Sequence, residues 1–334
     1  MAKLVGVLAC SHLLYITDEW AGRPPESWEK IRDSRDIRND VPFDSADERH
    51  KQADRVIAAL TTLKQKLADM RPDVLLIVGN DHDENFAAPD FEIMPMITVF
   101  TGATFSGKTY EYFLDRSADA RHVQVPGHPQ LAQAILYGLI ERGFDPAWSQ
   151  RVPQPDKGIG HAIMHPIGYF TDYSQPVVPI IINTFYSPAI SAKRCVALGR
   201  ALRDIVDNHP SDLRVVAIGT GGLWHTTFAP DSWLNEEFDR AGMKLLAAGD
   251  IEGWASYFDS YDVSGDPSNQ TSSEISRESS GMPQSPGPQF GTRETLDWIT
   301  ACAMADGRPF TVLDVIPAYS SPIDWGFAFC DSVG

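Results

Sequence analysis

The stretch VLLIVGNDH at residues 74–82 is a run of Val, Leu and Ile that stops at a glycine and is followed by three polar residues. A short apolar run bounded by turn residues predicts a strand that is buried on both faces. Five further runs share this character: Leu4–Ala9, Ile97–Phe100, Val177–Ile182, Val215–Gly219 and Phe310–Ile316. Longer segments with helical spacing lie between them. This alternation predicts an α/β fold with a central mixed sheet flanked by helices.

Four of the intervening segments have the signals of amphipathic helices. The clearest begins at Ser45, where SADE at residues 45–48 has the form of a capping box. Apolar residues then recur at alternating intervals of three and four, at Ala53, Val56, Leu60, Leu63 and Leu67. The other three are expected after His128-Pro129 with a stop at Gly143, over Ser191–Asn208, and over Glu294–Met304. We expect Cys195 to be a packed small hydrophobic residue of the third helix.

One long segment breaks this pattern. Over Ser264–Gly291, Ser, Pro, Gly and Gln dominate and aliphatic residues nearly vanish, so we expect a loop. A helix, a strand and an aromatic tail through Tyr319, Trp325 and Phe329 follow it. Because apolar elements return, we interpret residues 264–291 as an insertion in one large domain that spans residues 1–334. A loop of this length is a candidate lid.

The charge balance limits the partners of the chain. Lys and Arg total 28 against 45 Asp and Glu, a formal net charge of −17 over 334 residues. Nucleic acids and anionic membranes are bound through clustered basic residues, and the sequence supplies no such cluster. The four cysteines form no CxxC pair, which favours a reducing cytoplasm over a disulfide framework or a zinc ribbon. The apolar start of the chain is too short to span a bilayer.

Three of the predicted strands end in the same way. LACSH at residues 8–12, IVGNDH at 77–82 and IGTGGLWH at 218–225 each pass from an apolar run through small or polar residues to a histidine. Ligands of open α/β sheets bind beyond the carboxyl ends of the strands, where the loops converge. We therefore expect His12, His82 and His225 to meet at a metal site there, because imidazole suits iron, zinc, copper and nickel.

Such a site also needs a carboxylate. Two histidines and one carboxylate on one face of an octahedron leave positions open for substrate and oxygen. The nearest acids follow His225 in WLNEEFD at residues 233–239, at the start of an expected helix. Spacing alone does not choose between Glu236, Glu237 and Asp239, and acids in a first helical turn also interact favourably with the helix dipole.

Taken together, these motifs resemble those of the class III extradiol ring-cleaving dioxygenases. The similarity is to the group of the catalytic β subunit of protocatechuate 4,5-dioxygenase and related gallate and methylgallate dioxygenases. It rests on SH at residues 11–12, NDH at 80–82, GTGGLWH at 219–225 and NEEFD at 235–239, and it continues into Trp298 and IPAY at 316–319. In order and spacing these motifs cover nearly the whole chain.

The resemblance implies a role for each of these residues. The iron-binding histidines of the family fall on His12 and His82, its iron-binding glutamate on Glu237, and its acid/base histidine on His225. The implied cofactor is Fe(II), and the implied partners are a small aromatic diol and dioxygen. A histidine suits acid/base work in both directions because its pKa lies near neutral. Asp81 and Ser11 are candidates for orienting the ligand imidazoles.

The central region departs from the family pattern. Members often carry Asp-His-Gly there, whereas this chain reads DKGIGH at residues 156–161, with Lys157 in place of the histidine. Either His161 takes over that catalytic role or Lys157 contacts an anionic substrate; we favour His161. His165 follows one helical turn later, but Ala162 replaces the Glu of a zinc-protease motif, and Pro166 argues against a continuing helix.

The function implied by the resemblance is oxygen-dependent opening of a catecholic ring in a protocatechuate-like or gallate-like aromatic acid. An acidic chain needs a local cation to hold such an anion, and Lys157, Arg151 and Arg293 are the candidates. One alternative is a zinc-dependent hydrolase that uses the same His and Glu set. Another is a scaffold of the same fold that has lost its metal, although the chain retains every expected ligand.

Assembly follows from the resemblance alone. Homodimers are usual in this family, so we expect a homo-oligomer. Some relatives cover the active site with a separate small accessory subunit, and residues 264–291 could supply such a cover from within the chain.

Overall fold

The computed structural model describes residues 1–12, 32–33, 35–82, 84–86, 93–108, 121–156, 158, 160–186, 188–226, 231–262, 285–288 and 290–331. The strands are β1 (Lys3–Cys10), β2 (Val74–Gly79), β3 (Ile97–Phe100), β4 (Thr104–Lys108), β5 (His122–Pro126), β6 (Ala147–Ser149), β7 (Val177–Ile182), β8 (Arg214–Thr220), β9 (Thr311–Ala318) and β10 (Ile323–Cys330). The helices are α3 (Ala46–Met70), α4 (Pro129–Glu141), α5 (His161–Thr171), α6 (Ala192–Asp207), α7 (Glu236–Ala248), α8 (Ile251–Asp259) and α9 (Thr295–Ala303), with a 3-10 helix η4 (Phe290–Glu294).

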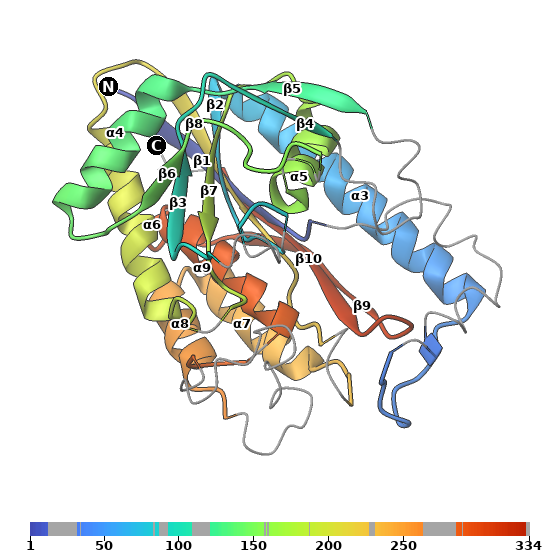
Figure 1. Ribbon diagram of the computed structural model, residues 1–334. Coiled ribbons are helices and arrows are strands. Elements are labelled where there is room, and N and C mark those ends of the chain that lie inside the picture. The colour runs from blue at the N-terminus through green and yellow to red at the C-terminus, as the bar shows by residue number, and fades with distance from the viewer. Residues whose placement is uncertain are drawn as a thin grey trace.

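An eight-stranded sheet forms the centre of the molecule, in the order β6-β3-β7-β2-β8-β1-β10-β9 (Figure 1). The four strands β7, β2, β8 and β1 run parallel to one another. β10 is antiparallel to both β1 and β9, and β3 is antiparallel to β7. The prediction of a mixed sheet flanked by helices is therefore confirmed. The six predicted strands are β1, β2, β3, β7, β8 and β9.

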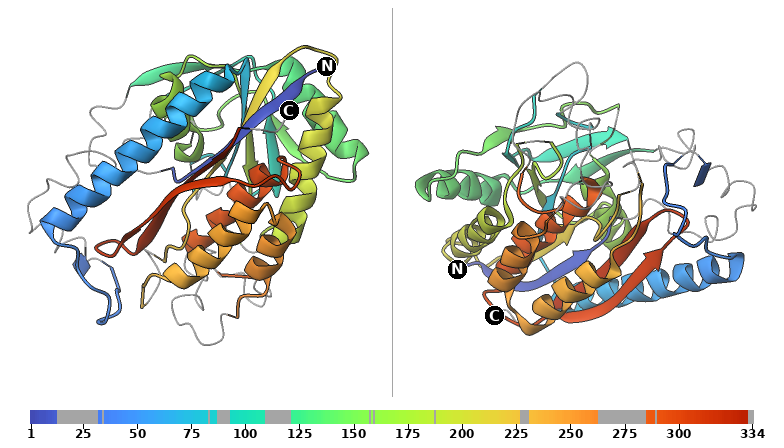
Figure 2. Two further views of the ribbon diagram at one scale, coloured as in Figure 1. Left: turned by 180° about the vertical axis from the view of Figure 1, so that it is seen from behind. Right: turned by 90° about the horizontal axis from the view of Figure 1, so that it is seen from below.

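The sheet separates two apolar cores. Side chains of β2 alternate between them: Leu75 and Ile77 pack with α3 and α5, whereas Leu76 and Val78 pack with α4, α6 and α9. Figure 2 shows α3 on one side of the sheet and α6 to α9 on the other. Because both faces are covered, the central strands are buried along their whole length, which explains why the predicting runs are continuously apolar.

The predicted helices form as their end signals indicate. Ser45 caps α3, and the Glu48 side chain completes the capping box by accepting the Ser45 backbone N–H. His128 precedes α4, and Gly143 lies just beyond that helix with a positive φ of 76°. Ser191 caps α6 by accepting the Arg194 N–H. All four cysteines are buried and unpaired, so the packing role expected for Cys195 is confirmed.

Two features differ from the predictions. The aromatic tail after Tyr319 includes a full strand, β10, which is buried between β1 and β9 and so lacks the alternating polarity of a half-exposed strand. In addition, α5 continues through Pro166 to Thr171. A proline removes only one hydrogen bond of the helix, here to the carbonyl of Ala162, and the buried side chains of Ile163 and Ile167 hold the helix against the sheet.

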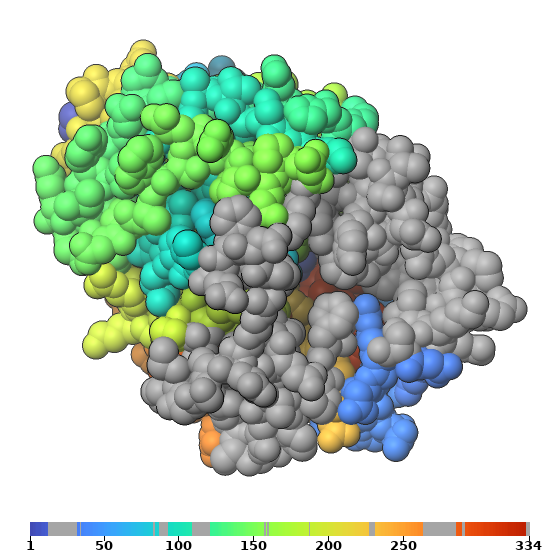
Figure 3. Space-filling model, in the orientation of Figure 1, coloured from blue at the N-terminus to red at the C-terminus, as the bar shows by residue number. Residues whose placement is uncertain are grey.

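Most of the loop predicted over residues 264–291 lies outside the described residues. The part that the structure describes, residues 285–288 and 290–291, leads into η4 and α9. Within the described parts of the chain, no helix is long and apolar enough to cross a membrane. The space-filling view shows a hollow in one face of the molecule, with red atoms of the C-terminal strands visible at its floor (Figure 3).

Candidate metal centre

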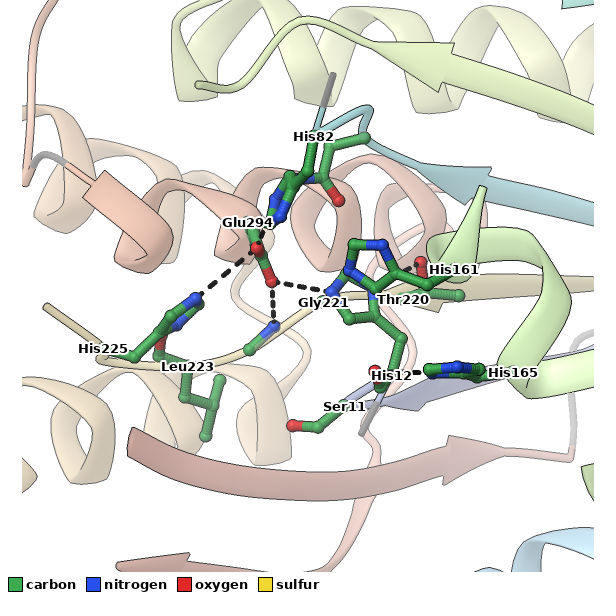
Figure 4. A network of polar contacts seen from close by, with 12 residues as sticks. Ser11, His12, His82, His161, His165, Thr220, Gly221, Leu223, His225 and Glu294 are labelled. Carbon is green, nitrogen blue, oxygen red and sulfur yellow. Dashed lines mark hydrogen bonds and ion pairs between the residues drawn. The ribbon is translucent and has the colours of Figure 1, made fainter. Parts of the chain in front are cut away.

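The three strand-end histidines lie together. β8 lies between β1 and β2 and runs parallel to both, so the chain leaves all three strands at the same edge of the sheet. His12 follows β1, His82 follows β2, and His225 follows β8 (Figure 4). Their Nε2 atoms lie 3.0, 2.8 and 3.4 Å, respectively, from a carboxylate oxygen of Glu294. The expected convergence at the strand ends is therefore present, and its centre is a carboxylate.

Glu294 is the last residue of η4 and directly precedes α9. Its side chain is 1% exposed and accepts the backbone N–H of Gly222 at 2.7 Å. Gly221 has a φ of 130°, and a Cβ there would lie 2.8 Å from the Cβ of Glu294, so only glycine lets the two segments approach. Burial alone would raise the pKa of Glu294, but the three histidines hold that pKa well below its usual range.

The hydrogen bonds at Nδ1 indicate which ring nitrogen of His12 and of His225 carries a hydrogen. The Thr220 hydroxyl donates to the Val78 carbonyl, so it accepts from Nδ1 of His12 at 3.4 Å. Nδ1 of His225 lies 3.0 Å from the Leu223 carbonyl, which can only accept, so this nitrogen also donates. Nε2 of both rings faces Glu294, and because Nδ1 is the donor to the other partner, Nε2 is the nitrogen that can bind a metal or exchange a proton.

The predicted carboxylate ligand is in a different place. Glu237 is exposed on α7, whose buried side chains include Phe238, Asp239 and Met243. The cap at Asn235 starts the helix so that Phe238 and Asp239 face inward, which turns Glu237 toward solvent. The structure thus does not bring Glu237 to the histidines, and this expectation is corrected: Glu294 is the carboxylate among them.

The other two acids of this segment also have other contacts. Glu236 accepts the hydroxyl of Tyr319. Asp239 is buried and accepts the Trp224 N–H at 2.8 Å. Ser11 and Asp81, the candidates for orienting the imidazoles, bind backbone groups instead: Ser11 accepts the Gly326 N–H, and Asp81 accepts backbone N–H groups at the start of the segment after β2.

His161 lies beside the histidine cluster. It is 1% exposed at the first position of α5, and its ring centroid lies 4.5 Å from that of His12 and 4.8 Å from that of His82. Its Nδ1 contacts the buried carboxylate of Glu84. Burial, together with His12 and His82, lowers the pKa of His161 well below its usual value, so the ring is neutral. One turn later, Nδ1 of His165 donates to the His12 carbonyl at 3.1 Å.

The three predicted substrate-binding cations have different outcomes. Arg151 is exposed. Lys157 lies outside the described residues. Arg293 is 1% exposed, and its guanidinium donates to the carbonyls of Thr184, Pro286, Pro288 and Ile190. Burial lowers the pKa of Arg293 to about 10, which leaves it charged at neutral pH. Arg293 therefore ties loops together and does not offer its charge to a substrate, contrary to the expectation.

Two residues of the site were missed in the sequence, Glu294 and Glu84. Glu294 directly precedes α9, in which even Asp297 and Thr300 are buried. An acid at the start of a largely apolar helix was therefore the sequence signal that could have indicated a buried carboxylate. Glu84 is two residues beyond His82, after the end of β2, where an acid is ordinarily solvated. Its burial depends on the distant segment around Gly160, and spacing along the chain carries no sign of that contact.

The donor set is chemically suited to a divalent transition metal. Two imidazoles and one buried carboxylate form the combination that holds non-haem Fe(II). Oε1 of Glu294 is buried, and the contacts it makes among the described residues are those with Nε2 of His82 and of His225. Within the described ranges, no group of three or more His, Cys, Asp or Glu is already spaced to hold a metal ion. The Nε2 atoms of all three imidazoles contact this carboxylate directly, so the groups that would bind a metal already lie together.

The fold and this centre define an α/β protein with a histidine–carboxylate cluster at the carboxyl ends of parallel strands. Residues 42–271 match the family described as the catalytic LigB subunit of aromatic ring-opening dioxygenase. The match covers more than half of the chain, and the chain belongs to this family.

Individual relatives are similar over shorter regions. A gallate dioxygenase of Pseudomonas putida is 32% identical over 127 residues, 36% of each chain. A 2,3-dihydroxyphenylpropionate/2,3-dihydroxicinnamic acid 1,2-dioxygenase of Escherichia coli is 26% identical over 178 residues, 53% of this chain and 51% of the relative. The chain thus spans about half or less of these relatives' length. An uncharacterized Escherichia coli K12 protein of known crystal structure covers 97% of this chain and 99% of its own at 13% identity, with a TM-score of 0.46.

Proposed function

We propose that the protein is a non-haem Fe(II)-dependent extradiol dioxygenase that opens a catecholic ring with both atoms of dioxygen. The observation that carries the proposal is the convergence of three strand-end Nε2 atoms on the buried carboxylate of Glu294. Membership of the ring-opening dioxygenase family supports the same reaction class. In this proposal His12, His82 and Glu294 hold the iron.

His225 is the proposed acid/base residue. Its Nδ1 hydrogen is held by the Leu223 carbonyl, so Nε2 can take a proton from a substrate hydroxyl and later return it. At 3.4 Å, its Nε2 is the farthest of the three from Glu294, which favours a role toward substrate over one as a ligand. When bound, Fe(II) would supply the electron transfer that lets dioxygen react with an aromatic ring. The protein residues supply binding, orientation and proton movement.

The substrate class is proposed to be an aromatic acid with adjacent hydroxyl groups. Relatives are named for gallate and for 2,3-dihydroxyphenylpropionate, which supports this class. Lys157 stays a candidate for the carboxylate of such a substrate, whereas the buried contacts of Arg293 argue against it. A homodimer and a small accessory subunit over the site stay predictions of the resemblance. A cytoplasmic location stays a prediction from the cysteine pattern, and a cover from residues 264–291 stays a prediction from the length and composition of that segment.

The test is anaerobic reconstitution with Fe(II), followed by a panel of catechols in aerated buffer with oxygen uptake as the readout. We expect uptake of one oxygen molecule per ring opened with at least one aromatic acid. The His225→Ala variant should retain iron but lose most turnover. An absence of oxygen uptake at full iron occupancy would contradict the proposal, and ester or amide hydrolysis by a zinc-loaded protein would favour the hydrolase instead.

A further inference from the structure

Glu84 and His161 form a buried contact beside the metal centre. Glu84 is 3% exposed, and its Oε1 accepts the backbone N–H of His161 at 3.0 Å and also contacts Nδ1 of the same residue. Its Oε2 is buried and makes no hydrogen bond among the described residues. One oxygen thus faces both the backbone N–H and Nδ1 of His161, and the carboxylate has no other side-chain hydrogen bond among the described residues.

The surrounding segments are shaped to bring Glu84 to this position. Asp81 accepts the N–H groups of Asn85 and Phe86 and the Asn85 side-chain amide, which holds the turn that contains Glu84. Gly160 precedes His161 with a φ of 95°, and a Cβ there would lie 3.3 Å from Oε2 of Glu84. Gly160 is also the N-cap of α5 and makes no side-chain capping bond. Glu84 therefore supplies the cap from outside the helix.

We propose that Glu84 is a positioning residue that holds His161 in the Nδ1-protonated tautomer, so that Nε2 of His161 is a hydrogen-bond acceptor beside His12 and His82. This rests on the proposed function for its use: an acceptor there would bind a hydroxyl hydrogen of an aromatic diol. The ring lies against both proposed ligand histidines, within 4.8 Å between centroids, so a diol at the metal centre would be within its reach. Glu84 and His161 together would then favour substrates that carry an O–H donor.

The direct test is nitrogen NMR of the metal-free protein labelled at histidine, which distinguishes a protonated Nδ1 from a protonated Nε2. We expect a single Nδ1-protonated tautomer for His161 in the wild type and a tautomer mixture in Glu84→Ala. Glu84→Gln, whose amide oxygen still accepts both hydrogens, should retain the wild-type tautomer. A wild-type His161 protonated at Nε2 would overturn the proposal even if the Glu84→Ala variant failed to fold.

Kinetics separate positioning from mere capping of a helix. For the iron-loaded protein we expect Glu84→Ala to lower kcat by about ten- to a hundredfold, as loss of an outer partner of a site histidine typically does, with a change in KM below about threefold. Ser191→Ala, which removes the cap of α6, is the matched control and should lower thermal stability similarly without changing kcat. An equal kcat in the two variants would overturn the proposal. Because the tautomer is read without metal or substrate, failure of the dioxygenase proposal would leave that result intact.

Discussion

At the scale of single residues, the centre depends on one carboxylate that contacts three imidazoles. Glu294 contacts His12, His82 and His225, and it also accepts a backbone N–H, so its negative charge is compensated despite full burial. A buried charge without such partners would be costly. The same compensation makes Glu294 the strongest candidate for the anionic metal ligand.

Exchanging carboxylates for amides distinguishes Glu294 from Glu237. Glu294→Gln keeps the size of the side chain and removes its charge, so we expect Fe(II) binding to weaken by more than about a hundredfold, beyond the usual cost of losing an outer partner. Glu237→Gln, on the exposed face of α7, is the matched control and should bind iron normally. The measurement is iron per protein after reconstitution and desalting. Iron loss confined to Glu237→Gln would return the ligand role to α7.

The position of the His225 ring depends on a glycine. A Cβ at Gly291 would lie 1.8 Å from Nε2 of His225, so Gly291→Ala must displace the ring. We expect kcat to fall by about a hundredfold, as small misplacements of catalytic groups do, with iron content unchanged. A Cβ at Gly307 would lie 3.9 Å from its nearest neighbour, the Gly249 carbonyl oxygen, so the control Gly307→Ala strains the backbone at a φ of 77° without touching the site. It should lower stability and retain kcat; equal activity of both variants would disprove this role of Gly291.

At the scale of elements, the segment before α9 carries both Glu294 and the buried Arg293. The guanidinium of Arg293 binds carbonyls from the segment after β7 and from residues 286–288, and it so joins two loops to η4. A guanidinium can serve this many acceptors because its donors are arranged in a rigid fork. The position of Glu294 therefore depends on contacts that its neighbour makes.

Replacing Arg293 tests whether it stabilises the fold or binds substrate. Arg293→Lys cannot reach all four carbonyls, and buried acceptors left without donors cost about 1–3 kcal/mol each. We expect the melting temperature of the metal-free protein to fall by roughly 5 °C or more, with KM for an aromatic acid changed by less than about twofold. Arg151→Lys, at an exposed position, is the control and should melt as the wild type does. A raised KM with unchanged melting would instead favour substrate binding by Arg293.

At the scale of the whole molecule, the net charge of −17 describes the surface, and the interior differs from it. The centre gathers histidines around a single carboxylate, whereas a second buried cluster pairs the carboxyl groups of Asp239 and Asp324 beneath the His225 loop. Asp239 accepts the Trp224 N–H, and the Asp324 N–H donates to the Trp224 carbonyl, so the pair holds both sides of this residue. Two adjacent buried carboxyls cannot both ionise cheaply.

This pair predicts how stability depends on pH. Burial, together with the charge of Glu236, raises the pKa of Asp324 from 3.8 to about 7, and burial also raises the pKa of Asp239. The folded state then holds more protons than the unfolded state between these values, so the free energy of unfolding falls as pH rises from about 4 through about 7. In Asp324→Asn the free energy of unfolding should decrease with pH by a few kcal/mol less than in the wild type. At pH 8 this variant should therefore unfold at a higher temperature than the wild type.

The measurement is thermal unfolding of the metal-free protein from pH 4 to pH 8. Other buried acids also titrate, so the informative quantity is the difference between the wild type and Asp324→Asn. The exposed Asp212→Asn is the control and should follow the wild type throughout. A wild type and an Asp324→Asn variant with parallel stability profiles would show that the pair does not share a proton.

Much of this molecule follows from local pattern. Continuous apolar runs predicted the parallel strands β1, β2 and β8, and the carboxyl ends of parallel strands share one edge, so the meeting of His12, His82 and His225 follows from sequence order. The ends of α3 and α4 were also predictable, because caps and terminal glycines act within a few residues. These features depend on residues that lie within a few positions of one another in the sequence.

The tertiary structure alone decided which carboxylate joins the histidines. The resemblance assigned Glu237, but the packing of Phe238 and Met243 turns α7 so that this side chain faces solvent. Glu294 reaches the cluster because α9 packs closely on β8, where a Cβ at Gly219 would lie 2.9 Å from Trp298. Glu84 and Arg293 are likewise defined by distant segments. Such contacts arise from the summed packing of the sheet and its helices, and no local window of sequence encodes that sum.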